Sequence, residues 1–347
     1  MTKVGSAKRD VPIRPLEPAV PSSQPVCHRF RTKSRRLPMP AWTASKAARL
    51  LLAPFLAWAA ASHSPAHAEP GLAHEVVGGS SEYVVRKGDS LTAIGARFGE
   101  SVADIARRNG LEPRHALQPG QRIQIDNRHI VPETLDDGVL INLPQRMLFF
   151  FRDGKLSGAY PVGLGKPSWP TPAGNFKVVA LRKDPTWHVP LSIQEEMRRE
   201  GKAVLTRVAP GPDNPLGRYW IGLSMAGYGI HGTSAPPSVY HFQSHGCIRL
   251  HPDDVESLFA DMQIGTTGKI IYAPLLLAEL PDGHIELEVN PDIYRKQPDP
   301  WDTLVRLAAQ NGLTDRIDWQ KARRVVKQQE GLARRIDRQA EVQAPAP

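Results

Sequence analysis

The stretch SHGCIRL, which runs from Ser244 to Leu250, places one cysteine directly after a glycine and a histidine. A second short stretch, GIHGT from Gly229 to Thr233, lies only a loop of about ten residues upstream. A thiol and an imidazole this close in sequence can meet across a loop closure, which nucleophilic thiol chemistry requires. The two stretches therefore predict Cys247 as the nucleophile and His231 as its base.

The charge of the chain is unevenly distributed. The sequence has 347 residues, a formal net charge of +9 and 41% hydrophobic residues, enough for two or three domains. Residues 1–68 carry 11 Lys and Arg against Asp10 and Glu17, which leaves 33 residues of each sign in residues 69–347. The body of the protein is therefore neutral, and we expect no nucleic-acid partner.

The basic leader has the pattern of an export signal. Lys46 and Arg49 precede an apolar run over residues 50–61, and Ala66 and Ala68 form a small-x-small cleavage pattern. We predict a signal peptide over residues 1–68, with 1–38 a start-site artefact if translation begins at Met39. The alternative, a membrane anchor, requires about 20 apolar residues. The expected location is the periplasm or cell envelope, with no stable membrane span after cleavage.

Cysteine usage supports a catalytic thiol. Cys27 would be removed with the leader, so Cys247 is the only cysteine of the predicted mature chain. No intramolecular disulfide can then form. A lone thiol in an oxidising compartment is typical of a catalytic nucleophile.

A small module is predicted after a flexible lead-in over residues 69–80. Residues 82–126 are predicted to form, in this order, a strand, two short helices and a closing strand. The unit resembles the LysM module, which implies binding to N-acetylglucosamine-containing polymers such as peptidoglycan; the alternative is a structural module without binding. The matching residues are Tyr83, Val84, Val85, Gly88, Asp89, Ser90, Leu91, Ile94, Phe98, Asn109, Leu117, Pro119, Gly120 and Ile123.

From Gly138 the sequence becomes a series of short apolar runs broken by Gly and Pro. This pattern predicts a mainly β domain of sandwich or barrel type over residues 138–273. The expected strands are 139–143, 147–151, 156–162, 176–181, 219–223 and 269–272. Helices are expected over 193–200, where Glu195 and Glu196 would lie on a solvated face, and from Pro252 to about Met262.

Residues 274–347 form a predicted C-terminal extension that is partly helical. Strands are expected at 275–280 and 285–289, and helices at 301–310 and from 318 to about 342. The last helix has a patchy apolar stripe of Trp319, Val326, Leu332 and Ile336. It either packs on its own domain, with part of it disordered, or serves as an interaction helix.

The residues around Cys247 suit acyl transfer. The backbone N–H groups of His245, Gly246 and Cys247 are expected to face one developing oxyanion. The carbonyl of Gly232 could orient the second ring nitrogen of His231. Two residues beyond the thiol, Arg249 can bind a carboxylate in a planar fork.

The two stretches, with their order and interval, resemble the YkuD-type L,D-transpeptidases. Carried over residue by residue, the resemblance makes Cys247 the nucleophile and His231 the base, with Gly232 as the orienting carbonyl. It also implies roles around them, with His245 and Gly246 shaping the catalytic turn and Arg249 and Ser244 on the substrate side. Tyr240 stands where many relatives have glycine, and we assign it to substrate binding. Further matches are Tyr160, Pro161, Val162, Gly163, Gly165, Thr171, Pro172, Ala173, Gly174, Phe176, Asn214, Pro215, Leu216 and Gly217.

The resemblance implies a reaction on peptidoglycan stems. Cys247 would form an acyl-enzyme by expelling the terminal D-alanine, and an amine of a neighbouring stem would resolve it into a 3→3 cross-link. The alternatives are L,D-carboxypeptidase activity, attachment of a lipoprotein, and a non-catalytic wall-binding scaffold. We expect no cofactor and no metal, although His241, His245, Cys247 and His251 form a cluster that a zinc site could use.

Overall fold

The computed structural model describes residues 71–338. The predicted signal peptide and the last nine residues lie outside this range. Within residues 71–338, no helix combines the length and the apolar character that a bilayer crossing demands.

The LysM-like unit has the predicted order of elements. It consists of β2 (Ser80–Val84), α1 (Leu91–Phe98), α2 (Val102–Arg108) and β3 (Arg122–Asp126), and the two strands pair antiparallel. Ser90 caps α1 by accepting a hydrogen bond from the backbone of Ala93, and Ser101 caps α2 in the same way. The apolar faces of the four elements meet in a core of Ile94, Ile105, Ile123 and Ile125.

The segment before this unit is part of the fold, so the predicted flexible lead-in is wrong. β1 (Val76–Val77) pairs antiparallel with β4 (His129–Ile130). Ala73 is 4% exposed, and its N–H donates to the carbonyl of Leu277 at 2.9 Å. Small and apolar side chains allow this segment to lie against the neighbouring strands, and the hydrogen bonds of its backbone then fix it.

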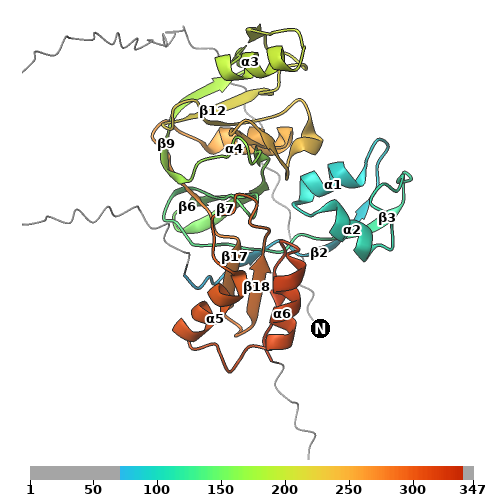
Figure 1. Cartoon of the computed structure of the whole chain (residues 1–347), viewed down its shortest axis with the longest axis vertical. Helices are drawn as coiled ribbons and strands as arrows, with labels where there is room; N and C mark the ends of the chain where they lie inside the picture. Colours follow the sequence, from blue (N-terminus) through green and yellow to red (C-terminus); the bar gives the residue numbers. More distant parts are fainter. Residues whose placement is uncertain (1–70, 339–347) are drawn as a thin grey trace, which may run out of the picture. The chain divides into compact units, whose positions relative to one another are not determined.

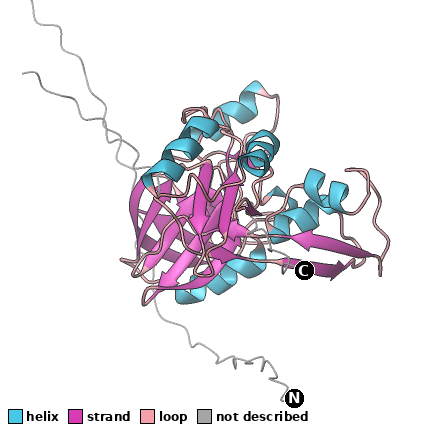
Figure 2. Ribbon diagram, turned by 90° about the horizontal axis from the view of Figure 1, so that it is seen from below, coloured by secondary structure: helices cyan, strands magenta, loops and turns pink. Residues whose placement is uncertain are grey.

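An eight-stranded sheet forms the centre of the catalytic domain (Figure 2). Its strand order is β15-β13-β12-β9-β16-β5-β6-β7, and the pairings are antiparallel except β13 with β15 and β16 with β5. The bounds are β5 Gly138–Asn142, β6 Met147–Arg152, β7 Lys155–Pro161, β9 Gly174–Lys183, β12 Tyr219–Leu223, β13 Gly229–His231, β15 Ile248–Arg249 and β16 Thr267–Ile271. The architecture is mainly β, as the sequence predicts.

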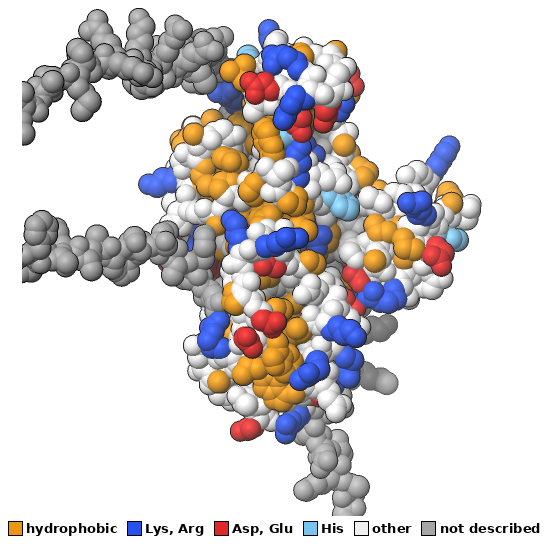
Figure 3. Space-filling view, in the orientation of Figure 1, with side chains coloured by type: hydrophobic (Ala, Val, Ile, Leu, Met, Phe, Trp, Pro, Cys, Tyr) orange, Lys and Arg blue, Asp and Glu red, His pale blue; other side chains and the backbone are white. Residues whose placement is uncertain are grey.

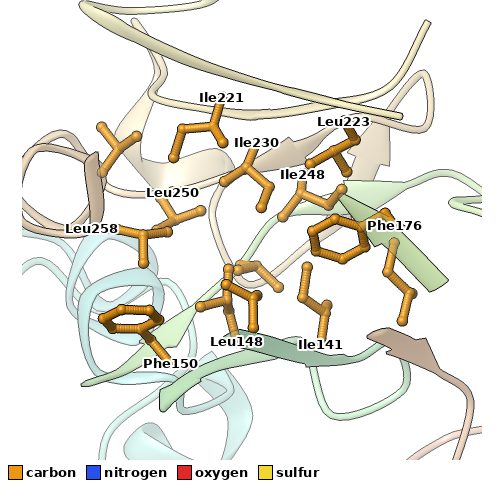
Figure 4. Close-up of a cluster of buried hydrophobic side chains, with 14 of the residues drawn as sticks. Ile141, Leu148, Phe150, Phe176, Ile221, Leu223, Ile230, Ile248, Leu250 and Leu258 are labelled. Carbon is orange, nitrogen blue, oxygen red and sulfur yellow. The ribbon is translucent and has the colours of Figure 1, made fainter. Parts of the chain in front are cut away.

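One face of this sheet packs against α4 (Pro252–Asp261), whose residues Val255 and Leu258 are buried. Side chains from distant strands point toward one another in this core (Figure 4). The close-up labels Ile141, Leu148, Phe150, Phe176, Ile221, Leu223, Ile230, Ile248, Leu250 and Leu258. Burying each such side chain contributes about 1.5–3 kcal/mol to folding, so the core holds β13 and β15 firmly in place.

Two smaller groups of elements complete this domain. β8 (Leu164–Gly165) pairs parallel with β14 (Phe242–Ser244), and the short helix η1 (Pro236–Ser238) precedes β14. Between β9 and β12 the chain makes an excursion that contains β10 (Trp187–His188), α3 (Leu191–Arg199) and β11 (Arg207–Val208).

The C-terminal extension builds its own small sheet. β17 (Leu275–Glu279), β18 (Ile285–Val289) and β19 (Arg334–Arg335) form it, and α5 (Pro300–Gln310) and α6 (Trp319–Gln328) pack on it, as Figure 1 shows in orange and red. The helix predicted from residue 318 to about 342 begins as expected but is too long, because α6 ends at Gln328; residues 339–342 lie outside the described range. Gln329 ends α6 in a left-handed conformation, and the chain turns at Gly331 to add β19 to the sheet. Leu332 and Ile336 are buried there.

The surface carries both signs of charge. Lys and Arg side chains alternate with Asp and Glu over the face in Figure 3, in keeping with the equal numbers of the two signs in residues 69–347.

Candidate active site

The neighbouring strands β13 and β15 bring the two predicted catalytic stretches together. Their parallel register places Ile230 opposite Ile248 and His231 opposite Arg249. Because side chains alternate along a strand, Ile230 and Ile248 enter the core, where both are fully buried. His231 and Arg249 therefore point to the other face, and so does Cys247, which directly precedes β15.

His231 is held in one tautomer. Its Nδ1 lies 2.6 Å from the carbonyl oxygen of Gly232. Since a carbonyl only accepts, Nδ1 carries the hydrogen and Nε2 is left with a lone pair. The ring stacks on Trp220 with the ring centroids 5.7 Å apart. Gly232 therefore lies where the sequence places it, beside the second ring nitrogen of the predicted base.

Burial sets the charge state of this imidazole. Desolvation, and then the nearby Arg249 guanidinium, lower the pKa of His231 to about 4. The imidazole is neutral at neutral pH and its Nε2 can accept a proton.

The thiol is neutral as well. Burial raises the pKa of Cys247, against smaller lowering effects from a backbone hydrogen bond and from Arg249. Its Sγ lies 3.7 Å from the carbonyl oxygen of Gly227. The two pKa shifts together favour a resting thiol and imidazole over a thiolate and imidazolium, so the proton would move as the sulfur attacks.

The catalytic turn, residues 244–247, is locked by one serine. The hydroxyl of Ser244 donates to the carbonyl of Cys247 at 2.6 Å and accepts from the N–H of Gly246 at 3.1 Å. Gly246 has φ +102°, and a Cβ there would lie 2.7 Å from Cε1 of Tyr228. Only glycine fits this position. The Gly246 N–H is thus engaged within the turn, which leaves the N–H groups of His245 and Cys247 as the candidate oxyanion donors.

His245 is fixed by residues that the sequence did not single out. Its Nε2 contacts Oε2 of Glu196 on α3, and Oε1 of Glu196 accepts from Nζ of Lys166 at 2.6 Å. The edge of Trp169 packs on the His245 ring, with the centroids 4.8 Å apart. The prediction that Glu196 belongs to a solvated helix face is wrong, because its carboxylate contacts Lys166 and the His245 ring of the catalytic turn.

Hydrogen bonds with Lys166, and then with His245, lower the pKa of Glu196 to about 2. The Glu196 side chain is therefore an ionised carboxylate at neutral pH and at mildly acidic pH. No sequence signal pointed to it, because 49 residues separate Glu196 from His245.

Replacing Glu196 by glutamine should slow turnover several-fold, because a neutral amide loses the ion pair with Lys166 and accepts a hydrogen bond less strongly than a carboxylate. Steady-state turnover of an acyl donor is the measurement. Glu195→Gln is the matched control on the same helix, since Glu195 is exposed. Equal turnover of the Glu196→Gln variant and the parent would show that this contact does not matter for catalysis.

Arg249 presents an unpaired guanidinium beside the thiol. Its backbone is fixed by two hydrogen bonds with Gly163, each 2.8 Å long. Among the described residues no acid pairs with its side chain, and its buried Nε has no hydrogen-bond partner. An uncompensated, partly buried cation in this position favours an anionic ligand such as a carboxylate.

The structure does not bring Tyr240 to the site. Its backbone has φ +63°, and the residue is 2% exposed, in a core that it shares with residues of β6 and β17. The Arg146 guanidinium lies 3.8 Å from the ring centroid, and the Arg146 side chain also donates to the Tyr240 carbonyl at 3.1 Å. Tyr240 contributes to packing beneath the loop that leads to Ser244.

A cavity of about 560 Å³ lies beside the base, with Gly232 and Thr233 in its wall. Within its lining, Arg218 contacts Asp184 at 3.6 Å and the hydroxyl of Tyr219 donates to Glu256 at 2.6 Å, while the lining residue Asp253 pairs with Arg97 outside the cavity. A space of this volume is typical of small-ligand sites. Across residues 71–338, no group of three or more His, Cys, Asp and Glu side chains is arranged to hold a metal ion.

Comparisons with known proteins identify two family domains in this chain. The model of the YkuD L,D-transpeptidase catalytic domain matches residues 136–271, and the LysM domain model matches residues 83–126. "Probable L,D-transpeptidase ErfK/SrfK" of Salmonella typhimurium is 31% identical over 209 residues, which are 60% of this chain and 67% of the relative. "Probable L,D-transpeptidase YcfS" of Escherichia coli is 30% identical over 237 residues, which are 66% of this chain and 74% of the relative.

Among solved structures, the Ldtfm–avibactam carbamoyl enzyme aligns at 25% identity with a TM-score of 0.33, over 41% of this chain and 51% of that chain. The chain thus spans about half the length of that protein. The sequence matches by themselves show that this chain belongs to the family of YkuD-type L,D-transpeptidases and carries an N-terminal LysM domain.

Proposed function

We propose that the protein forms 3→3 cross-links in peptidoglycan through an acyl-enzyme on Cys247. The observation that carries this proposal is the register of β13 and β15, which puts a neutral His231, the thiol and an unpaired Arg249 on one face. A base with a free lone pair, a nucleophile and a carboxylate-binding group are the parts that acyl transfer between peptide stems needs.

In the first half-reaction Sγ of Cys247 attacks the carbonyl carbon of the third residue of a tetrapeptide stem. The thiol proton passes to Nε2 of His231 as the C–S bond forms. The negative charge that develops on the carbonyl oxygen is stabilised by the Cys247 N–H, with His245 N–H as a second donor. The C–N bond to the terminal D-alanine then breaks, and His231 returns its proton to the departing amine.

In the second half-reaction an amine of a neighbouring stem attacks the thioester. His231 accepts a proton from this amine, the C–S bond breaks, and the sulfur recovers a proton from His231. The new amide is the cross-link. Arg249 is positioned to bind a carboxylate of the donor stem, and the cavity beside Gly232 and Thr233 offers room for part of a stem.

The LysM domain supports the choice of substrate. A module that binds the glycan strands would raise the local concentration of stems near the thiol. The same module and the predicted signal peptide support a location in the cell envelope.

The direct test is to incubate the protein with tetrapeptide muropeptides and analyse the products by mass spectrometry. We expect cross-linked dimers and released D-alanine. Tripeptides without dimers would instead indicate the carboxypeptidase alternative, with water as the acceptor. Conjugates of the stem with an added lysine-bearing peptide, in place of muropeptide dimers, would indicate that the acceptor is a lipoprotein.

A further inference from the structure

The carbonyl of Gly246 is held from outside the catalytic turn. The hydroxyl of Thr171 donates to this carbonyl at 2.8 Å and accepts from the N–H of Gly165 at 3.0 Å. Thr171 is fully buried. Because a peptide unit is planar and trans, the Gly246 carbonyl and the Cys247 N–H point in opposite directions. Fixing the carbonyl on Thr171 therefore also fixes the direction of the Cys247 N–H.

Thr171 is held in turn by a residue of the C-terminal extension. The hydroxyl of Tyr294 donates to the carbonyl of Gly165 at 2.6 Å and accepts from the N–H of Thr171 at 3.3 Å. One hydroxyl thus fixes both ends of the loop from Gly165 to Thr171. Tyr294 lies beyond residues 136–271, which match the catalytic domain of the family.

Tyr294 is itself firmly placed. Its N–H donates to the hydroxyl of Tyr272 at 2.9 Å, and that hydroxyl also contacts the carboxylate of Asp292. The two tyrosine rings stack with their centroids 5.6 Å apart. The edge of Phe242 packs on Tyr294 at 5.7 Å, and Phe242 begins the strand that leads to Ser244. The ring and the hydroxyl of Tyr294 therefore touch both segments that support the catalytic turn.

We propose that Tyr294 is a positioning residue for acyl transfer. Through Thr171 and the Gly246 carbonyl, its hydroxyl orients the Cys247 N–H toward the developing oxyanion. The C-terminal extension would then contribute to the reaction. The proposed role of Tyr294 rests on the proposed function only in the identity of the acyl donor. The thiol itself does not contact Tyr294, so its intrinsic reactivity does not depend on this chain of hydrogen bonds.

The variant Tyr294→Phe removes only the hydroxyl and keeps the stacked ring. We expect the rate of Cys247 acylation by a tetrapeptide muropeptide to fall about tenfold, with KM changed less than about twofold, because a misdirected oxyanion donor weakens the transition state selectively. Alkylation of the thiol by iodoacetamide forms no oxyanion, and its rate should stay within about twofold of the parent.

A double-mutant cycle tests whether Tyr294 acts through Thr171. Thr171→Val also breaks the chain of hydrogen bonds, so adding Tyr294→Phe to it should cost little more than Thr171→Val alone. Tyr160→Phe is the matched control, because it removes a tyrosine hydroxyl that lies 3.4 Å from Ser257, away from the turn. We expect the control to match the parent in acylation.

Hydrogen exchange gives a readout that needs no enzymatic activity. In Tyr294→Phe the amide hydrogens of residues 244–249 should exchange several-fold faster than in the parent, while those of the LysM domain should not change. Parent-like exchange and acylation in Tyr294→Phe, strict additivity in the cycle, or an equal loss of acylation and alkylation would each overturn the inference. A parent protein that fails to react with muropeptides would count against the proposed function, and the exchange measurement would still decide the role of Tyr294.

Discussion

Replacing Cys247 by alanine is expected to lower cross-link formation by at least about 10³-fold, because no other group of the site can form the acyl intermediate. Within residues 71–338, Cys247 is the only cysteine. His231 has its base nitrogen free but no nucleophile to activate once the sulfur is gone. The residual rate would reflect only binding and the backbone donors of the turn.

The measurement is product formation from tetrapeptide muropeptides, read by mass spectrometry together with the mass of the intact protein. The parent should show a transient adduct with the mass of the acyl group, and the alanine variant none. Cys247→Ser is a matched variant that keeps the volume of the side chain and replaces the thiol by a much less acidic hydroxyl. Undiminished cross-linking by the alanine variant would support the non-catalytic scaffold and exclude the proposed mechanism.

Replacing His231 by glutamine is expected to lower acylation by about 10²–10⁴-fold, the usual contribution of a general base. The glutamine can still donate to the Gly232 carbonyl, but it has no nitrogen that accepts the thiol proton. Because burial raises the pKa of the thiol, the variant should also be alkylated more slowly than the parent near neutral pH. Equal alkylation rates in the two proteins would contradict the prediction that His231 activates the Cys247 thiol.

The same substitution should change how stability depends on pH. The pKa of His231 is about 4 in the folded protein and about 6.5 when unfolded, so between these values only the unfolded chain binds the proton. The contribution of His231 to the stability of the parent therefore rises with pH through this window, is fully present above pH 6.5, and is lower at pH 4 by on the order of 3 kcal/mol. The glutamine variant lacks this dependence.

Urea unfolding of both proteins at several pH values between 4 and 7 gives the comparison. The two unfolding free energies are subtracted because burial raises the pKa of Asp254 to about 6, and this shift makes stability fall with pH over the same window. That contribution is present in both proteins and cancels. A difference that does not vary with pH would mean that His231 is accessible to protons in the folded state.

Local signals were enough to identify most elements of this protein. The short apolar runs at residues 139–143 and 147–151 predicted two strands that the structure places at β5 and β6 within one residue. The order of strand, helix, helix and strand predicted the unit at 82–126. These predictions succeeded because periodicity and turn residues act over a few positions along the chain.

Predictions failed where a distant segment decides the local conformation. The tail after Gln328 has a helical pattern, yet pairing with β18 draws residues 334–335 into a strand. Glu196 looked like one of several surface acids, but only the folded chain sets it beside Lys166 and His245. Tyr240 appeared close to the nucleophile in sequence, and its left-handed backbone turns the ring into the core instead.

The sequence by itself determined the family and predicted the thiol and its base, because these inferences depend on residue types at short spacing around Gly229–Thr233 and Ser244–Leu250. Only the tertiary structure decided their charge states, the locking of the turn by Ser244, and the support from Thr171 and Tyr294. Burial sets the charge states, and the support from Thr171 and Tyr294 comes from hydrogen bonds between residues 75 and 123 positions apart, which no local pattern encodes. The bonds of Ser244 are local, but their geometry depends on the fold that holds the turn.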